Sequence, residues 1–252
     1  MEVRFSKGFA RTTLKVLLLI ALLLCSISFA SQAYALVNDS DMEVLGVNLA
    51  NDLYLLDVDA EASVPTWFSS SILLLCSMLL GLITYTAKRA GDRYSLYWGV
   101  LSIVFVLMSL DEQVSIHERF IEPLRSLLDT GGILYFASVL PGIVFVVIFG
   151  LVYRRFLFNL PVTIRRLFVA AGALYVLGSI GMEMVGGFVA DLRGEHNLPY
   201  ITLTTVEEFL EMFGAIVFLY ALIRYTHCFK EPTGRIGSQN PAKRTNQGDA
   251  LS

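Results

Sequence analysis

The chain has 252 residues, of which 55% are hydrophobic and only 16% are charged, and its mean hydropathy is +0.64. This composition is too apolar for an ordinary water-soluble domain and predicts an integral membrane protein. The net charge is −3 and the three cysteines are scattered, which excludes a disulfide framework. The basic residues flank apolar stretches, which argues against nucleic-acid binding.

Residues 1–35 have the features of a secretory signal. Four basic residues precede an apolar stretch from Val16 to Ala30, and Ala33-Tyr34-Ala35 has the pattern of a cleavage site. The stretch is long for a signal peptide and short for a membrane span, so an uncleaved signal-anchor helix is the alternative. In both interpretations, the segment that follows is exported.

Residues 36–66 contain seven acidic residues and neither Lys nor Arg. We expect an acidic extracytoplasmic segment, which is either a solvated loop or a lid that attracts cations to the outer side. Val-Asn-Leu and Leu-Tyr-Leu-Leu patches within it could form short strands. Pro65 suits a first helical turn and Trp67 suits the membrane interface, so a helix is expected to begin there.

Five apolar spans follow, each close to the length that a bilayer requires. We therefore expect an all-α fold, a polytopic transmembrane bundle over residues 67–228 with five spans after a signal peptide or signal anchor. A disordered cytoplasmic tail is expected over residues 229–252. The predicted spans are Phe68–Ala87, Tyr94–His117, Ile133–Tyr153, Leu167–Gly187 and Leu203–Tyr225.

The charges between the spans predict the orientation. When the spans are threaded in order, 16 of the 19 Lys and Arg residues fall on one side, which the positive-inside rule makes cytoplasmic. The acidic residues follow the opposite pattern, with 18 of 22 on or near the other side. We expect a multipass protein of the plasma (inner) membrane with an exported N-terminal segment.

Ionisable residues lie near the outer end of three predicted spans, although a carboxylate at a helix centre costs about 2.5–3.5 kcal/mol. Asp111, Ser115 and Glu118 are predicted to share one face of the second span. Small residues beside Glu183 turn it towards the bundle, and Glu211 lies deepest in the last span. The topology is expected to bring eight side chains together: Asp111, Glu112, His117, Glu118, Glu183, Glu207, Glu208 and Glu211.

Seven of these eight side chains are carboxylates, and they cannot all stay ionised at close quarters. The cluster must share protons, recruit Arg119 or Arg193, or bind a cation. We expect a divalent metal such as Fe, Mn or Zn in a site rich in oxygen ligands with one imidazole, although no Glu-x-x-His pair is present. The predicted ligands are Asp111, Glu112, His117, Glu183, Glu207 and Glu211.

The leading functional hypothesis is a metal-dependent membrane enzyme that acts on a lipid-like substrate. If the metal activates a bound water, the protein would be a hydrolase, with Glu118 and Glu208 as the predicted catalytic acids and bases. If the metal is redox-active, the protein would be an oxidoreductase. A proton- or cation-coupled transporter is the first alternative, although the inner halves of the spans are nearly all apolar. A non-catalytic scaffold or subunit is the second. Tyr153 and Phe156 are expected at lipid-facing or interfacial-belt positions rather than in a cofactor site.

Overall fold

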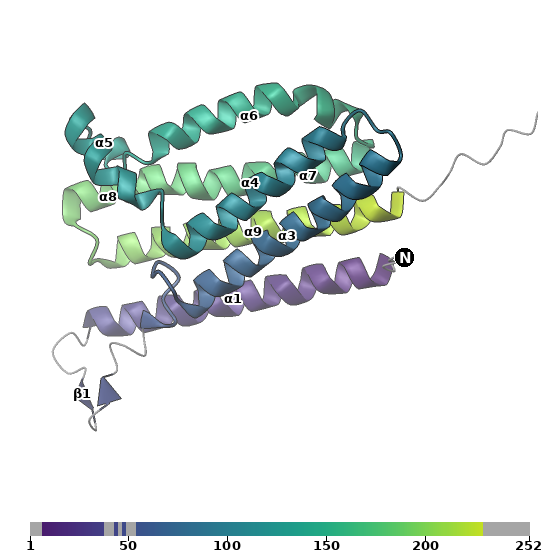
Figure 1. Cartoon of the computed structure of the whole chain (residues 1–252). Coiled ribbons are helices and arrows are strands. Elements are labelled where there is room, and N and C mark those ends of the chain that lie inside the picture. Colours follow the sequence, from purple (N-terminus) through teal and green to yellow (C-terminus); the bar gives the residue numbers. More distant parts are fainter. Residues whose placement is uncertain (1–6, 38–42, 45–46, 49–53, 229–252) are drawn as a thin grey trace, which may run out of the picture.

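Long helices lying side by side dominate the computed structural model (Figure 1), which describes residues 7–37, 43–44, 47–48 and 54–228. Five helical segments in this part of the chain are long and apolar enough to cross a membrane, which confirms the predicted all-α membrane bundle, although the five include the N-terminal helix and do not include the last predicted span, Leu203–Tyr225. The predicted disordered tail lies outside the described residues. The five segments are α1 (Lys7–Val37), α3 (Val64–Arg89), α4 (Ser95–Val114), α6 (Val139–Asn159) and the continuous run of α7 (Val162–Val176), η3 (Leu177–Met182) and α8 (Glu183–Arg193).

Helix α9 (Leu198–Cys228) is the core of the bundle, because it packs against α1, α3, α7 and η3. Met212, Ile216 and Leu222 on this helix are at most 1% exposed. The last predicted span therefore has protein on several sides. Side chains on α9 are positioned by their neighbouring helices rather than by lipid.

Helix α1 packs along α9 as a structural helix, and a cleaved signal peptide is not shown by this arrangement. Ala21 and Ser28 are fully buried. The hydroxyl of Ser28 accepts a hydrogen bond of 2.9 Å from the backbone N–H of Val58, and the amide of Gln32 donates to Asp57. These contacts fix the segment that leads from the acidic region into α3.

Helices α3 and α4 are joined by reciprocal serine hydrogen bonds. Ser70 donates to the carbonyl of Ser109 at 2.8 Å, and Ser109 donates to the carbonyl of Ser70 at 2.9 Å. Two turns further along, Ser77 and Ser102 repeat the exchange at 2.8 and 2.9 Å. Small polar residues allow close helix approach in a membrane, where apolar burial adds little. The hydrogen-bonded α3–α4 pair therefore holds the residues at the end of α4 in place.

Helix α4 ends at Val114, three residues before the predicted end at His117. Ser115 turns into the left-handed region with φ of 44°, and its N–H bonds to the carbonyl of Asp111, which stops the helix. The prediction that Asp111, Ser115 and Glu118 share one helical face is therefore wrong. Glu118 instead begins the short 3-10 helix η1 (Glu118–Phe120), which leads into α5 (Ile121–Leu128).

Two further predicted spans differ in detail. The third begins at Val139, because residues from Gly132 form the separate short helix η2 (Gly132–Leu134). The fourth is not one regular α-helix, because η3 within it is π-helical. Such wide turns are rare in α-helices and are frequent at functional sites.

The acidic N-terminal region contains a small hairpin, in which β1 (Glu43–Val44) pairs antiparallel with β2 (Val47–Asn48). The expected strand at the Val-Asn-Leu patch is confirmed for its first two residues. Helix α3 begins after Ser63, whose hydroxyl accepts a hydrogen bond of 3.2 Å from the N–H of Thr66. Pro65 lies in the first turn of α3, as predicted.

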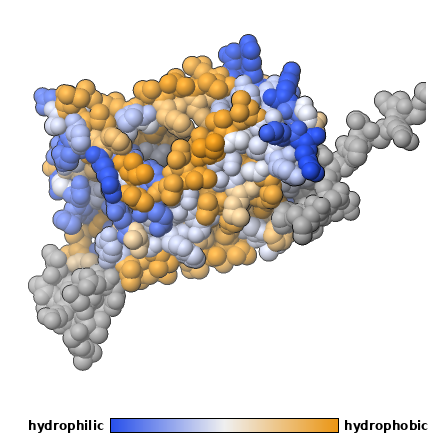
Figure 2. Space-filling model, in the orientation of Figure 1, coloured by the Kyte–Doolittle hydropathy of each residue, from blue (hydrophilic) through white to orange (hydrophobic). Residues whose placement is uncertain are grey.

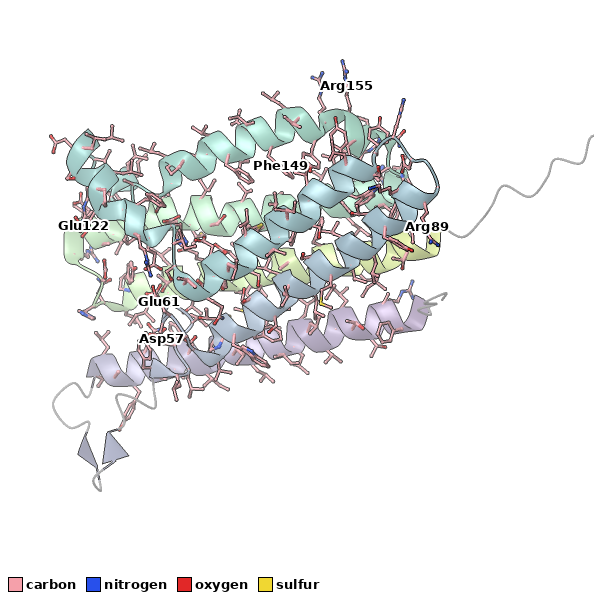
Figure 3. The ribbon with its side chains drawn as sticks, in the orientation of Figure 1. Asp57, Glu61, Arg89, Glu122, Phe149 and Arg155 are labelled. Atoms are coloured by element: carbon pink, nitrogen blue, oxygen red, sulfur yellow. The ribbon has the colours of Figure 1, made fainter. Side chains whose placement is uncertain are left out.

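The two ends of the bundle differ in charge. Figure 2 shows an apolar band between two hydrophilic ends. In Figure 3, Asp57, Glu61 and Glu122 lie at one end, and Arg89 and Arg155 lie at the other. We call these the acidic end and the arginine end. Their separation agrees with the predicted threading of charges across the membrane.

Candidate functional site

All eight predicted side chains lie at the acidic end and interact with one another. Residues from the last turn of α4, the loop and η1 beyond it, the start of α8 and the first half of α9 supply them. The prediction that acids from separate helices meet is confirmed. Their roles as ligands or catalytic groups remain predictions.

The centre of the cluster joins α4 to α9. The carboxyl of Glu208 interacts electrostatically with those of Glu112, Glu211 and Glu207. Glu211 also interacts with Glu112 and His117. All three glutamates of α9 are half-buried. Negative charges from two helices therefore share one low-dielectric region, where their mutual repulsion is stronger than in water.

Hydroxyl groups from three other elements hold the central carboxyls individually. A hydroxyl can donate or accept, so it satisfies a carboxyl whether or not that carboxyl is protonated. The pairs also fix the positions of the acids, because each hydroxyl comes from a different element than its partner, Ser138 from the turn before α6 and the other two from helices. They are Glu183 with Ser138 at 2.7 Å, Glu112 with Ser69, and Glu211 with Tyr175.

His117 is held by Asp111 through two hydrogen bonds. The imidazole Nδ1 lies 2.9 Å from Oδ2 of Asp111, and the backbone N–H of His117 donates to Oδ1 at 2.9 Å. Burial alone would lower the pKa of His117, but the hydrogen bond to Asp111 and the charges of Asp111, Glu183 and Glu118 outweigh it and raise the pKa to about 9. The imidazolium is thus the cationic group of the cluster at neutral pH.

Two glycines allow the helices to approach closely beside Glu211. A Cβ on Gly178, in η3, would lie 2.8 Å from Cγ of Glu211 and 2.9 Å from the carbonyl of Glu207. A Cβ on Gly214 would lie 2.8 Å from both the carbonyl of Ala171 and the N–H nitrogen of Tyr175. Only glycine fits at these distances. The contact brings the hydroxyl of Tyr175 to the carboxyl of Glu211.

The acidic region before α3 lies beside the cluster. Glu61 interacts with Glu118, and Asp59 interacts with both Glu207 and Glu208. Desolvation by the surrounding protein, together with the charges of Asp57, Glu118 and Glu195, raises the pKa of Asp59 above its usual range, although Asp59 is exposed at the surface. This proximity is compatible with both expected interpretations, a solvated acidic loop and a lid over the outer site.

Basic side chains do not neutralise the central acids in the part of the chain that the structure describes. The ion pairs there are His117 with Asp111 and Arg125 with Glu122. Arg119 and Arg193, which were possible partners, form no ion pair among the described residues. The acidic cluster therefore carries an excess of negative charge unless it binds protons or another cation.

The predicted metal ligands do not form a ready ligand sphere. Among the described residues, no group of three or more His, Cys, Asp and Glu side chains is placed to hold a metal ion. The hydroxyl contacts explain this geometry, since they hold Glu112, Glu183 and Glu211 towards different helices. A site for Fe, Mn or Zn would require these side chains to turn away from their hydroxyl partners.

Sequence reasoning missed the residues that organise the acids, among them Ser69, Ser138, Tyr175 and Gly178. Serines and tyrosines are common in spans, so these three gave no distinct signal. The role of Gly178 was partly predictable, because small residues along the fourth span were expected to mark a close helix contact. The π-helical turn that directs Gly178 at Glu211 left no recognisable sequence pattern.

Aromatic side chains close the bundle on the far side of the site. Trp98 is 1% exposed, and its ring centroid lies 4.7 Å from that of Phe156 and 4.7 Å from that of Tyr225. Tyr153 and Phe156 are 4% and 1% exposed, so of the two expected positions, lipid-facing or interfacial belt, the lipid-facing one is wrong. They are buried because α6 approaches α4 at the arginine end, where Tyr153 donates a hydrogen bond to the carbonyl of Tyr97.

The surface is hollowed between α6 and α4. Figure 2 shows this hollow, with apolar residues around much of its rim and hydrophilic residues beside it. Helix α6 is buried only near its ends, at Val139, Tyr153 and Phe156, while its middle is exposed or half-buried. Phe149, labelled in Figure 3, lies in this middle part and stacks on Tyr153 at 4.1 Å. The hollow is thus open on the apolar face of the bundle.

Comparison with known proteins identifies a family. The chain belongs to the family described as "Domain of unknown function (DUF8692)", which it matches over residues 14–226. The match includes most of α1 and nearly all of α9. No curated protein and no solved structure matches the chain.

Proposed function

We propose that this member of the DUF8692 family is a multi-span membrane protein whose acidic cluster takes up cations from the predicted extracytoplasmic side. One observation carries the proposal: Glu112, Glu208 and Glu211 interact across two helices, and no Lys or Arg is ion-paired to them among the described residues. Intramembrane carboxylates are costly and commonly mark proton or cation sites.

The hydrogen bonds favour protons as the cation. Each of Glu112, Glu183 and Glu211 contacts its own hydroxyl, which fits a carboxyl that gains and loses a proton in place. Acids that repel one another so strongly share protons as a group rather than titrate independently. The cluster would release protons as a second cation enters and take them up as it leaves.

Proton- or cation-coupled transport is the functional class that makes use of such a site. The buried aromatic rings around Trp98 lie between the cluster and the arginine end, which favours access to the cluster from the acidic end in this conformation. Transport would need a second conformation. The π-helical η3 lies against the site through Gly178 and Glu211, so a change in its packing would alter the cluster directly.

A metal-dependent enzyme acting on a lipid-like substrate is the second candidate, and two observations favour it. Nδ1 of His117 is held by Asp111, an arrangement that would leave Nε2 for a metal once the imidazolium had given up its Nε2 proton, as in carboxylate–histidine–metal sites. The hollow between α6 and α4 would give a lipid a lateral route towards the acidic end (Figure 2). Glu118 and Glu208 would then be the acids and bases of the reaction.

Infrared titration of the purified protein tests the first candidate. Protonated carboxyl groups give a carbonyl band that disappears on ionisation, and Glu211→Gln should remove part of this band relative to the wild type. Glu122→Gln is the matched control, because Glu122 is exposed and paired with Arg125 outside the cluster. Equal titrations of the wild type and Glu211→Gln would overturn proton binding at the cluster.

Two further measurements separate the candidates. Elemental analysis should find no stoichiometric Fe, Mn or Zn if the cluster binds protons, whereas metal that is lost in Glu183→Gln would favour the enzyme. Proteoliposomes should show cation movement that depends on a pH gradient and is abolished by Glu211→Gln. A flat response to the gradient would argue against transport even if the carboxyls titrate.

A further inference from the structure

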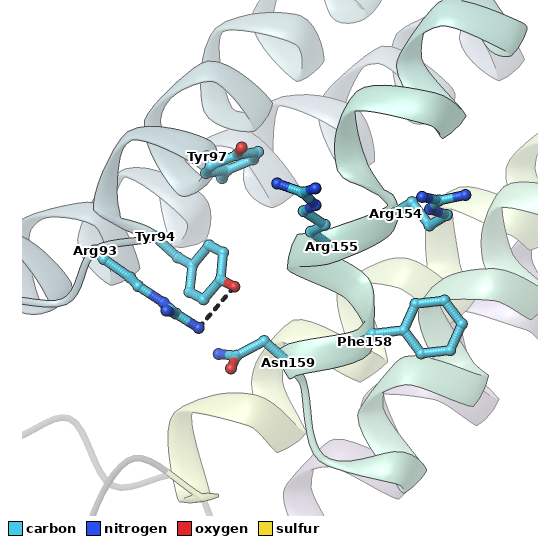
Figure 4. A pocket seen from close by; sticks show the side chains of 7 residues that line it. All are labelled: Arg93, Tyr94, Tyr97, Arg154, Arg155, Phe158 and Asn159. Atoms are coloured by element: carbon cyan, nitrogen blue, oxygen red, sulfur yellow. Dashed lines mark hydrogen bonds between the residues drawn. The ribbon is translucent and has the colours of Figure 1, made fainter.

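A second site lies at the opposite end of the molecule from the acidic cluster. A pocket of about 630 Å³ opens between the start of α4 and the end of α6 (Figure 4). Pockets that hold small ligands have volumes of about 300–1,000 Å³. Three arginines, Arg93, Arg154 and Arg155, line it together with Tyr94 and Tyr97.

This pocket is positively charged, and its arginines are placed to bind an anion. Among the described residues, none of the three arginines is ion-paired with a carboxylate. Arg93 lies over the ring of Tyr94, with its guanidinium carbon 4.7 Å from the ring centroid, and donates a hydrogen bond of 3.0 Å to the Tyr94 hydroxyl. The adjacent acid, Asp92, instead accepts a hydrogen bond from the backbone N–H of Tyr94.

The wall of the pocket is rigid because the rings behind it are packed. The ring of Tyr97 stacks on that of Phe156 with an interplanar angle of 1°, and Tyr153 donates a hydrogen bond of 2.9 Å to the Tyr97 carbonyl. Tyr94 contacts Phe156 edge-on at 5.8 Å. The arginines, one from the turn before α4 and two from α6, are thus presented on a preformed aromatic surface, which lowers the entropic cost of binding.

We propose that this pocket binds the phosphate headgroup of an anionic phospholipid from the predicted cytoplasmic leaflet. Guanidinium groups bind phosphate oxygens through paired, charge-assisted hydrogen bonds, and basic pockets between membrane helices on the cytoplasmic side bind lipid headgroups. The pocket lies at the arginine end, where residues just before and in the first turn of α4 face the last turns of α6. From there, the exposed apolar residues Leu151 and Ile148 of α6 continue towards the middle of the bundle and offer a surface for acyl chains.

Native mass spectrometry of the full-length protein, with phosphatidylglycerol or phosphatidylcholine added, tests the proposal. We expect retention of phosphatidylglycerol but not of phosphatidylcholine. The double substitution Arg93→Gln/Arg155→Gln should weaken retention by about tenfold or more, since it removes charge-assisted contacts to phosphate. Arg166→Gln is the matched control, because Arg166 is an exposed arginine of α7 that does not line the pocket. It should change retention by less than about twofold.

Three outcomes would overturn the proposal: equal retention of both lipids, an equal loss in Arg166→Gln, or displacement of the lipid by inorganic phosphate at a matched phosphate concentration. The last would identify free phosphate as the ligand. If the double variant fails to fold, Arg155→Lys provides the test, because it keeps the charge but loses the paired donors. It should still weaken retention of phosphatidylglycerol, and unchanged retention would contradict recognition by the guanidinium.

Discussion

The acidic end and the arginine end of this bundle are held together by different physical means. At the acidic end, half-buried carboxyls contact hydroxyls across helices that approach closely at glycines. At the arginine end, large aromatic rings around Trp98 are buried and packed against one another. The comparison indicates that aromatic packing makes the arginine end rigid, whereas the acidic end can change its protonation and hydrogen bonding.

The same comparison explains why the acids are tolerated. A buried polar group is costly unless it is partnered, and an unpaired charge is costlier still. For its central acids, the acidic end meets this requirement with hydroxyls such as Ser138 and Tyr175 rather than with Lys or Arg from the part of the chain that the structure describes. Because a hydroxyl does not neutralise a carboxylate, the cluster stays dependent on protons or another cation, which is the basis of the proposed function.

The largest expected effect is at the arginine end, where Trp98→Ala removes the centre of the aromatic packing. We expect a loss of about 3–5 kcal/mol in the free energy of unfolding, as for other buried large-to-small substitutions of aromatic residues. Far-ultraviolet circular dichroism during denaturation in detergent would measure it. Trp67→Ala is the control, because Trp67 is 66% exposed and should cost little. Similar losses in both variants would contradict a packed aromatic core.

Gly214→Ala tests the close helix contact at the acidic end. The added Cβ would lie 2.8 Å from two backbone atoms, which cannot move without separating α9 from α7. We expect a loss of about 1–3 kcal/mol, typical of overpacking. Gly172→Ala on α7 is the control, since its Cβ would meet no atom within 4 Å. It should stabilise the helix by up to about 1 kcal/mol. A loss in both variants would show that the contact is not specific.

The two ends of the bundle also show which features the sequence could predict. Hydropathy and charge predict the membrane class and the separation of the two ends, because they depend on residue type and order alone. The meeting of the acids from α4, α8 and α9 follows from the same threading. Residue type gave no sign of the early stop of α4 at Ser115, nor of the π-helical turn in η3, because both depend on local backbone geometry fixed by packing.

The predicted lipid exposure of Tyr153 and Phe156 failed for a related reason. An aromatic residue near a membrane interface suits either lipid or a neighbouring helix, and its sequence position does not distinguish them. The choice is made where α6 approaches α4, a contact between segments about 55 residues apart in the chain. The arginine pocket depends on the same approach, so it too was beyond sequence reasoning.

Tyr175→Phe tests the hydroxyl network with a smaller expected effect. It removes the hydrogen bond to Glu211 while keeping the ring, so we expect a loss of about 0.5–1.5 kcal/mol. It should also change the infrared carboxyl band that Glu211→Gln removes. Tyr85→Phe is the control, because Tyr85 is 57% exposed on α3, away from the cluster. An unchanged carboxyl band in Tyr175→Phe would mean that the hydroxyl does not affect the protonation of Glu211.

The smallest expected effect is the pH dependence that comes from His117. Its pKa in the folded protein is about 9, above the unfolded value of about 6.5. The stabilisation by the imidazolium is therefore fully present below about pH 6.5 and is lost as the pH rises through about 9. The side chain is 49% exposed, so the contribution is about 1 kcal/mol or less. The difference in melting temperature between wild type and His117→Gln should shrink from pH 6 to pH 10, whereas a constant difference would contradict a charged His117 paired with Asp111.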